Sequence, residues 1–162
     1  MKRFSKLFGI IALVAIIGFS MVACDDGNGN GGGNELNGTW VIRVGGYGND
    51  GNIEHDETLT FNNGNFEWTW YEASSRGNYT TTDNLSITFN FLEIKFLANS
   101  YEVEEFGIEA NRWFTKSGLR EVVDMDDEEF EDNFRYYFES ETEVYSVSGN
   151  TLVLFGEIYT RR

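Results

Sequence analysis

The feature that most constrains the fold is an alternation of apolar and polar residues with a period of two, repeated along most of the chain. The apolar positions are Trp40, Ile42 and Val44; Leu59 and Phe61; Phe66, Trp68 and Trp70; and Leu85, Ile87, Phe89 and Phe91. Successive side chains of a β-strand point to opposite faces, so each run predicts a strand with one buried face. Residues 151–155 and 157–161 are expected to form the last strands.

Turn signals separate these runs. Asn63-Gly64 joins two of them and suits a type I′ hairpin, because both residue types tolerate a positive φ. Asp83-Asn84 and Gly149-Asn150 are weaker signals of the same kind. Together the runs and turns predict an all-β fold in which successive strands form an antiparallel meander.

The period changes before the final hairpin. Phe130, Phe134 and Phe138 are spaced as on one helix face, and Asp126 is placed to cap that helix. A shorter helix is expected to start at Ser117, which makes one or two short helices. Within 92–116 strand number and order stay open, because Ile94 and Phe96 fall out of phase with Phe91, a sign of a bulge or a turn.

The first residues have the order of an export signal. Lys2, Arg3 and Lys6 precede an uncharged apolar run that ends at Ala23-Cys24. A small residue followed by cysteine resembles the bacterial lipobox, in which the cysteine is lipidated. We therefore expect a signal peptide at 1–23, a Gly/Asn-rich lipid-anchored tether at 24–35 and a folded domain at 36–162. The expected location is the cell envelope, outside the cytoplasm.

Cys24 is the only cysteine, so a chain lipidated there has no disulfide, no thiolate nucleophile and no cysteine zinc site. The whole chain has 27 acidic and 12 basic residues and a net charge of −15. Removal of the signal peptide, which carries basic residues and no acidic ones, would make the net charge of the remaining chain more negative. Such a charge opposes binding of nucleic acid, which we do not expect as a partner.

No motif predicts catalysis, a cofactor or a metal. The acidic stretch 121–143 lacks the glycine of an EF-hand loop, so we interpret it as a helix start and a solvated face, with calcium binding left open. His55 is the only histidine, and beside Glu54 and Asp56 it is interpreted as a surface residue. We therefore expect a protein that is not an enzyme.

Several short motifs carry a family resemblance. They include Leu36-x-Gly-Thr-Trp40, Phe61-x-Asn-Gly-Asn-Phe66, Gly77-x-Tyr-Thr-Thr81, Trp113-Phe-Thr-Lys-Ser117, Tyr145-Ser-Val-Ser-Gly-Asn-Thr-Leu152 and Tyr159-Thr-Arg161. With the lipobox and the tether, this pattern resembles the lipocalin-like lipoproteins of spirochaetes. The resemblance implies a small antiparallel, up-and-down β-barrel in which Arg161 packs on Trp40 and closes one end. It implies no specific ligand.

The resemblance also implies an interior cavity, which alternation would line with aromatic side chains. The candidate ligand-lining residues are Phe66, Trp68, Trp70, Ile87, Phe89 and Phe91. The first functional hypothesis is binding of a small apolar or amphipathic molecule in a membrane-tethered barrel. The alternative is an envelope or host-facing interaction protein whose barrel core is filled by these same residues.

Overall fold

The computed structural model describes residues 33–47, 53–82 and 85–162 of the chain. The expected signal peptide, Cys24, the tether up to residue 32 and the Asp83-Asn84 turn lie outside the described residues. Residues 33–35 of the expected tether belong to a short helix, α1 (Gly33–Leu36), whose last residue is fully buried.

The first five strands form an antiparallel meander. They are β1 (Gly38–Tyr47), β2 (Ile53–Asn62), β3 (Asn65–Thr69), β4 (Ala73–Thr82) and β5 (Ser86–Phe96). At the β2–β3 turn Asn63 and Gly64 have φ values of 47° and 83°. Both values are positive, as the predicted type I′ hairpin requires.

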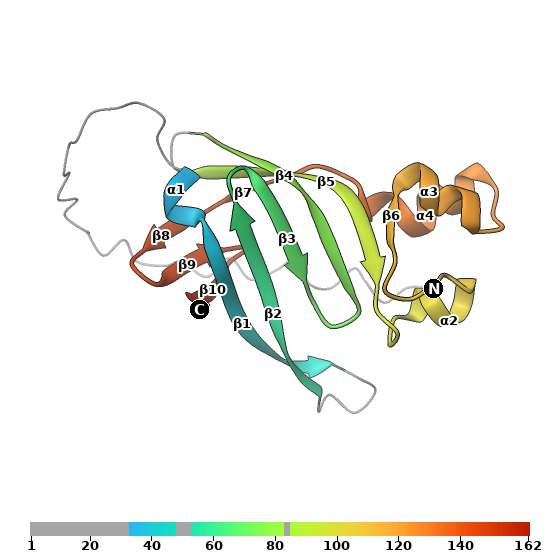
Figure 1. The fold of residues 1–162 in the computed structure, drawn as a ribbon, viewed down its shortest axis with the longest axis horizontal. Helices are drawn as coiled ribbons and strands as arrows, with labels where there is room; N and C mark the ends of the chain where they lie inside the picture. The colour runs from blue at the N-terminus through green and yellow to red at the C-terminus, as the bar shows by residue number, and fades with distance from the viewer. Residues whose placement is uncertain (1–32, 48–52, 83–84) are drawn as a thin grey trace.

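The remaining strands bring the sheet back to its beginning. They are β7 (Glu141–Val144), β8 (Ser146–Ser148), β9 (Thr151–Leu154) and β10 (Glu157–Arg161). β7 pairs with β5, the chain passes through Tyr145 into β8, and β8, β9, β10 and β1 then pair in turn. The predicted all-β, antiparallel, barrel-like fold is thus confirmed, and Figure 1 shows β1–β5 as one wall with the late strands behind it.

A bulge in β5 explains the loss of phase in the sequence. Gly77 of β4 pairs with Phe91 and Arg76 pairs with Glu93, so Leu92 is the extra residue. The insertion leaves Ile94 and Phe96 on the same face as Phe91. A Cβ at Gly77 would lie 1.9 Å from the Asn90 carbonyl oxygen, so this close approach of the two strands requires glycine.

Short helices follow the bulged end of β5. They are α2 (Tyr101–Phe106), α3 (Lys116–Val122), α4 (Asp127–Phe134) and the 3₁₀ helix η1 (Arg135–Tyr137), with the short strand β6 (Trp113–Thr115) between α2 and α3. The Asp126 side chain accepts a hydrogen bond from the Glu129 N–H, as the sequence predicted for a cap. Helix α2 and strand β6 were not predicted, because each is too short to show a period.

One concave sheet face carries two hydrophobic cores. The barrel core lies under β7–β10 and contains Leu36, Trp40, Leu59, Phe61, Phe66, Tyr79, Ile87, Phe89, Tyr145, Leu152, Leu154 and Tyr159. The helical core lies under α3 and α4 and contains Ala73, Ile94, Phe96, Ile108, Phe114, Leu119, Val123, Phe130 and Phe134. Figure 1 shows the helices gathered at the end of the molecule away from α1.

Candidate ligand-binding site

The end of the barrel next to α1 is closed. Trp40 is fully buried, and the Arg161 guanidinium lies 4.4 Å from the centre of its ring. The Trp40 indole N–H donates to the Leu36 carbonyl at 2.7 Å, and Arg161 donates to the Glu35 carbonyl. Helix α1, the first strand and the last strand are thereby joined at this end.

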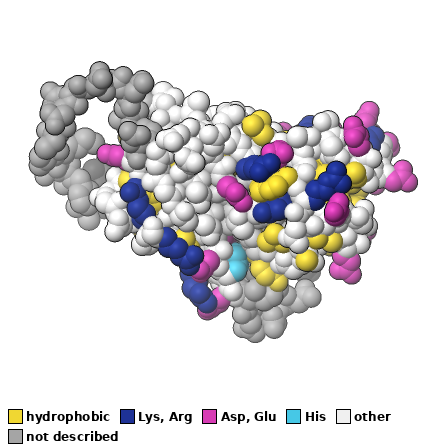
Figure 2. Space-filling model, in the orientation of Figure 1, with side chains coloured by type: hydrophobic (Ala, Val, Ile, Leu, Met, Phe, Trp, Pro, Cys, Tyr) yellow, Lys and Arg dark blue, Asp and Glu magenta, His cyan; other side chains and the backbone are white. Residues whose placement is uncertain are grey.

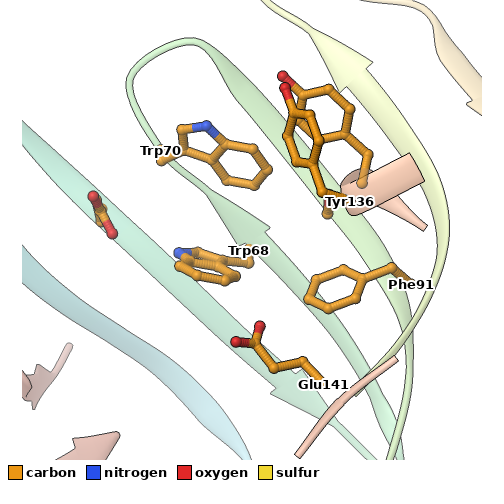
Figure 3. Close-up of a pocket in the computed structure, with 8 residues that line it drawn as sticks. Trp68, Trp70, Phe91, Tyr136 and Glu141 are labelled. Carbon is orange, nitrogen blue, oxygen red and sulfur yellow. The ribbon is translucent and has the colours of Figure 1, made fainter. Parts of the chain in front are cut away.

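A pocket of about 310 Å³ lies at the junction of the two cores. Its lining residues are Glu57, Trp68, Trp70, Ser75, Phe91, Tyr136, Tyr137 and Glu141. Trp68 and Phe91 pack against the barrel core, whereas Trp70 and Tyr137 pack against the helical core. Figure 3 shows Trp68 and Trp70 on one side of the pocket, with Tyr136 and Phe91 opposite them.

The structure divides the six predicted lining residues into two groups. Trp68, Trp70 and Phe91 line the pocket. Phe66, Ile87 and Phe89 do not line it, and they are buried in the barrel core. The reason is their position along the strands, because β7–β10 cover the part of the sheet from which these three side chains project.

The other lining residues were not predicted as site residues. Tyr136 and Tyr137 come from η1, and their rings lie 4.1 Å apart. Glu57 and Glu141 belong to strands β2 and β7. The sequence did contain a sign of Glu57, because it lies two residues before Leu59 and four before Phe61 on the same strand. Alternation therefore places its side chain on the inner face with theirs.

Glu57 is a nearly buried carboxylic acid. Its side chain is only 13% exposed, and burial raises its pKa above the ordinary value. His55 opposes this rise, because its Nε2 lies 3.6 Å from a Glu57 carboxylate oxygen and stabilises the charge. The carboxylate of Glu157, on β10, adds to the rise by repulsion.

Glu141 lies at the exposed rim of the pocket. Its pKa is also raised, first by partial burial and then by repulsion from Glu143. In Figure 3 its carboxylate extends from β7 toward the space between Trp68 and Phe91. The two acids therefore approach the pocket from opposite walls of the barrel.

The two tyrosines are held over the pocket by another acid. The Tyr137 hydroxyl donates to Glu102 Oε1 at 2.6 Å, and burial followed by this hydrogen bond raises its pKa. Glu102 also accepts a hydrogen bond from the Ser100 hydroxyl at 2.6 Å. Burial likewise raises the pKa of Tyr136. Both hydroxyls thus stay protonated, and the residue pair presents neutral rings.

Trp68 has one polar atom left to satisfy. Its buried indole N–H makes no hydrogen bond to another described residue, although it is near enough to Glu57 to favour the charged carboxylate. The Phe155 ring stacks on Trp68 with centroids 4.8 Å apart. Phe155 has a φ of 55°, uncommon for a bulky residue, and its side chain closes the space between the pocket and the barrel core.

A second hollow, of about 710 Å³, lies beside α3 and α4 and is open to solvent. Its charged side chains pair with one another: Arg120 lies 3.0 Å from Asp127, and Lys116 lies 2.7 Å from Glu131. These ion pairs occupy part of the acidic stretch in which calcium binding had been left open. In the described part of the chain, no group of three or more His, Cys, Asp or Glu side chains could hold a metal ion.

The outer face of β3–β6 also carries charge pairs. The Trp113 ring lies between Arg76 and Lys95, at 4.3 and 4.5 Å, and Arg76 in turn lies 2.6 Å from Glu93. Figure 2 shows basic and acidic side chains around hydrophobic atoms on this face. On this outer face, Arg76 and Lys95 therefore already have partners.

Comparisons with family models, with curated proteins and with solved structures returned no match for this chain. Within residues 33–47, 53–82 and 85–162, no helix has the length and apolar character needed to cross a membrane.

Proposed function

We propose that the protein is an extracytoplasmic lipoprotein, tethered through Cys24, that binds a small amphipathic molecule in the pocket between its two cores. The observation that carries the proposal is the mixed wall of a pocket of about 310 Å³, in which Trp68 and Trp70 lie opposite Phe91 and Tyr136 (Figure 3). Ligand pockets typically begin at about 300 Å³ and combine aromatic walls with a few polar groups.

Tryptophan fluorescence tests the binding. The complete chain in a nonionic detergent is titrated with hydrophobic dyes, lipids and small amphipathic molecules. Saturable changes are expected, because a bound molecule would lie against the indoles of Trp68 and Trp70. Trp68→Ala should weaken binding, whereas Trp113→Ala, on the outer face, should bind like the parent protein. Equal loss in both variants would contradict the proposed site.

The interaction-protein hypothesis has one observation in its favour. Phe66, Ile87 and Phe89 fill the barrel under β7–β10, and the Trp40–Arg161 end is closed. Most of the interior therefore has no space for a small molecule. No saturable binding across the whole panel would favour this second function.

The tether is tested separately. The basic start, the apolar run and the Ala23-Cys24 junction motivate the prediction that Cys24 carries the lipid. In a bacterial host, Cys24→Ala should abolish labelling by radioactive palmitate and release the protein from the membrane or stall its processing. Normal membrane retention of the unlabelled variant would contradict the lipid anchor.

A further inference from the structure

We infer that the preferred ligand is an organic cation with an apolar body, whose positive group lies near Glu57 and Glu141 while its body lies against the aromatic wall. This inference rests on the proposed function and adds the chemical class of the ligand.

The described charged residues that line the pocket are all acidic. Glu57 and Glu141 are its ionisable carboxylates, and no lysine or arginine is among its described lining residues. Glu102 lies directly behind Tyr137, and Glu143 and Glu157 are near the two lining acids. An anionic ligand such as a fatty acid would meet repulsion from each of these groups, whereas a cation would be attracted.

The aromatic rings of the pocket also favour a cation over an anion. A cation over the face of tryptophan or tyrosine is attracted to the negative face of the π-system. Trp68 and Trp70 lie with centroids 5.5 Å apart and planes inclined by 59°, so they form two sides of a corner. Tyr136 and Tyr137 add a second pair of rings on the opposite side. Aromatic corners with carboxylates at the edge suit ammonium groups.

The cations of the protein itself do not neutralise this pocket. Arg76 and Lys95 lie on the outer face with Trp113 and their own acids, and Arg161 is held over Trp40. His55 is the basic side chain beside Glu57, with its Nε2 3.6 Å from that carboxylate. Arg135, beside Tyr136, is paired with Glu139 at 3.0 Å. Glu141 is in none of the ion pairs found among the described residues. A bound cation would therefore supply the positive charge that no lysine or arginine among the described lining residues brings to the pocket.

Two other ligand classes fit less well. A neutral sugar could stack on the same rings and donate hydrogen bonds from its hydroxyls to Glu57 and Glu141, but it brings no positive charge to these two acids. A small hard metal ion requires several oxygen ligands at short range, and no such group exists among the described residues. A large, weakly hydrated organic cation satisfies both the rings and the carboxylates.

The test uses three probes with the same aromatic body and different charge. Benzyltrimethylammonium is the cation, benzyl alcohol is neutral and phenylacetate is the anion. Each is titrated calorimetrically into the complete chain in a nonionic detergent. We expect the cation to bind at least about tenfold more tightly than the alcohol, and the anion to bind most weakly.

Charge-neutral variants locate the effect. Glu141→Gln should reduce affinity for the cation by about tenfold and leave affinity for benzyl alcohol unchanged. Glu57→Gln should act in the same direction. The matched control is Glu121→Gln, which removes one negative charge from an exposed site at the end of α3, outside the pocket. If net charge alone attracted the cation, all three variants would lose affinity equally, and the inference would be wrong.

The inference and the proposed function fail in different ways. Binding of benzyl alcohol or phenylacetate as tight as that of the cation, weakened by Trp68→Ala, would overturn the cation preference and keep the ligand-binding function. Absence of binding by all three probes and by the wider panel would overturn both. Cation binding that is insensitive to both Glu57→Gln and Glu141→Gln would overturn the assigned site.

Discussion

The barrel core and the helical core cover the same face of the same sheet in different ways. Over the barrel core, β7 pairs with β5 and β8–β10 extend the sheet from β1, and their side chains pack against those of the opposite wall. Over the helical core, segments of six to eight residues lie on Ile94, Phe96 and Phe114. Isolated helices this short are unstable in water, so these depend on their contacts with the sheet.

The difference shows why the pocket lies where it does. Each of these strands lies beside its hydrogen-bonded neighbour at a constant spacing, so paired strands cover the core without a gap between them. A helix covers the sheet only along its own length, about 1.5 Å per residue, so its cover ends where its axis ends. The chain changes from helix to strand between Tyr137 and Glu141, and the pocket lies at this change.

The largest expected effect is at the closed end of the barrel. Trp40→Ala should lower the free energy of unfolding by about 3–5 kcal/mol, because it deletes a fully buried aromatic ring and leaves Arg161 without its stacking partner. Urea unfolding, followed by fluorescence, measures the loss. Trp113→Ala on the outer face should cost less, and an equal loss would mean that the two faces contribute alike.

The bulge between the two regions gives the next effect. Gly77→Ala would place a Cβ 1.9 Å from the Asn90 carbonyl oxygen, so the strands must separate. We expect a loss of about 1–3 kcal/mol in the free energy of unfolding. Gly45→Ala is the matched strand control, because its Cβ would meet only ordinary contact with Glu54 at 3.7 Å. A neutral Gly77→Ala would show that the close approach is not required.

A smaller effect should stay within the helical region. Asp126→Ala removes the side chain that accepts from the Glu129 N–H, and should cost about 1 kcal/mol. Hydrogen exchange should accelerate in α3 and α4 and remain unchanged in β1 and β10, if the helical region opens locally. Asp126→Ser keeps a capping oxygen and should restore most of the protection. Equal acceleration in β1 would mean that both cores unfold together.

The smallest effect concerns the acid between the two regions. The pKa of Glu57 is raised in the folded state, so folding favours its protonated form. Its contribution to stability is therefore present at low pH and is lost as pH rises through the folded-state pKa. Three other groups act on it or are acted on by it: His55 opposes the rise, Glu157 adds to it, and Glu57 itself raises the pKa of Tyr159.

Glu57→Gln makes this sign testable. Relative to the parent protein, the variant should gain most stability near pH 7, and the difference should shrink at lower pH as Glu57 takes up a proton. Urea unfolding at neutral pH and at lower pH measures the two differences. The control Glu121→Gln should show a difference that changes little with pH. A Glu57→Gln advantage that grows on acidification would contradict the direction of the pKa shift.

The strands were predictable because their signal is local. Trp40, Leu59 and Phe61 alternate with polar neighbours, and that alternation alone assigns each side chain to a face. Asn63-Gly64 was predictable for the same reason, since a two-residue turn depends on its own φ values. Helix α4 followed from Asp126 and the spacing of Phe130 and Phe134. It ends at Phe134, however, and Phe138, predicted on the same helix face, follows η1. Helix α2 was not predictable, because six residues contain too few turns to show a period.

By itself, then, the sequence determined which side chains of most strands face inward, although Leu85, which alternation placed on the buried face, lies before β5 and is exposed. The tertiary structure decided which part of the inner face is covered by strands and which by helices. Phe66 and Trp68 share a face and a strand, yet the first is core and the second lines the pocket. Glu57 and Glu141 meet at that pocket from strands far apart in sequence. An alternation with a period of two shows which face of the sheet a side chain is on. Which strand or helix packs over that side chain depends on pairing between segments far apart in the sequence.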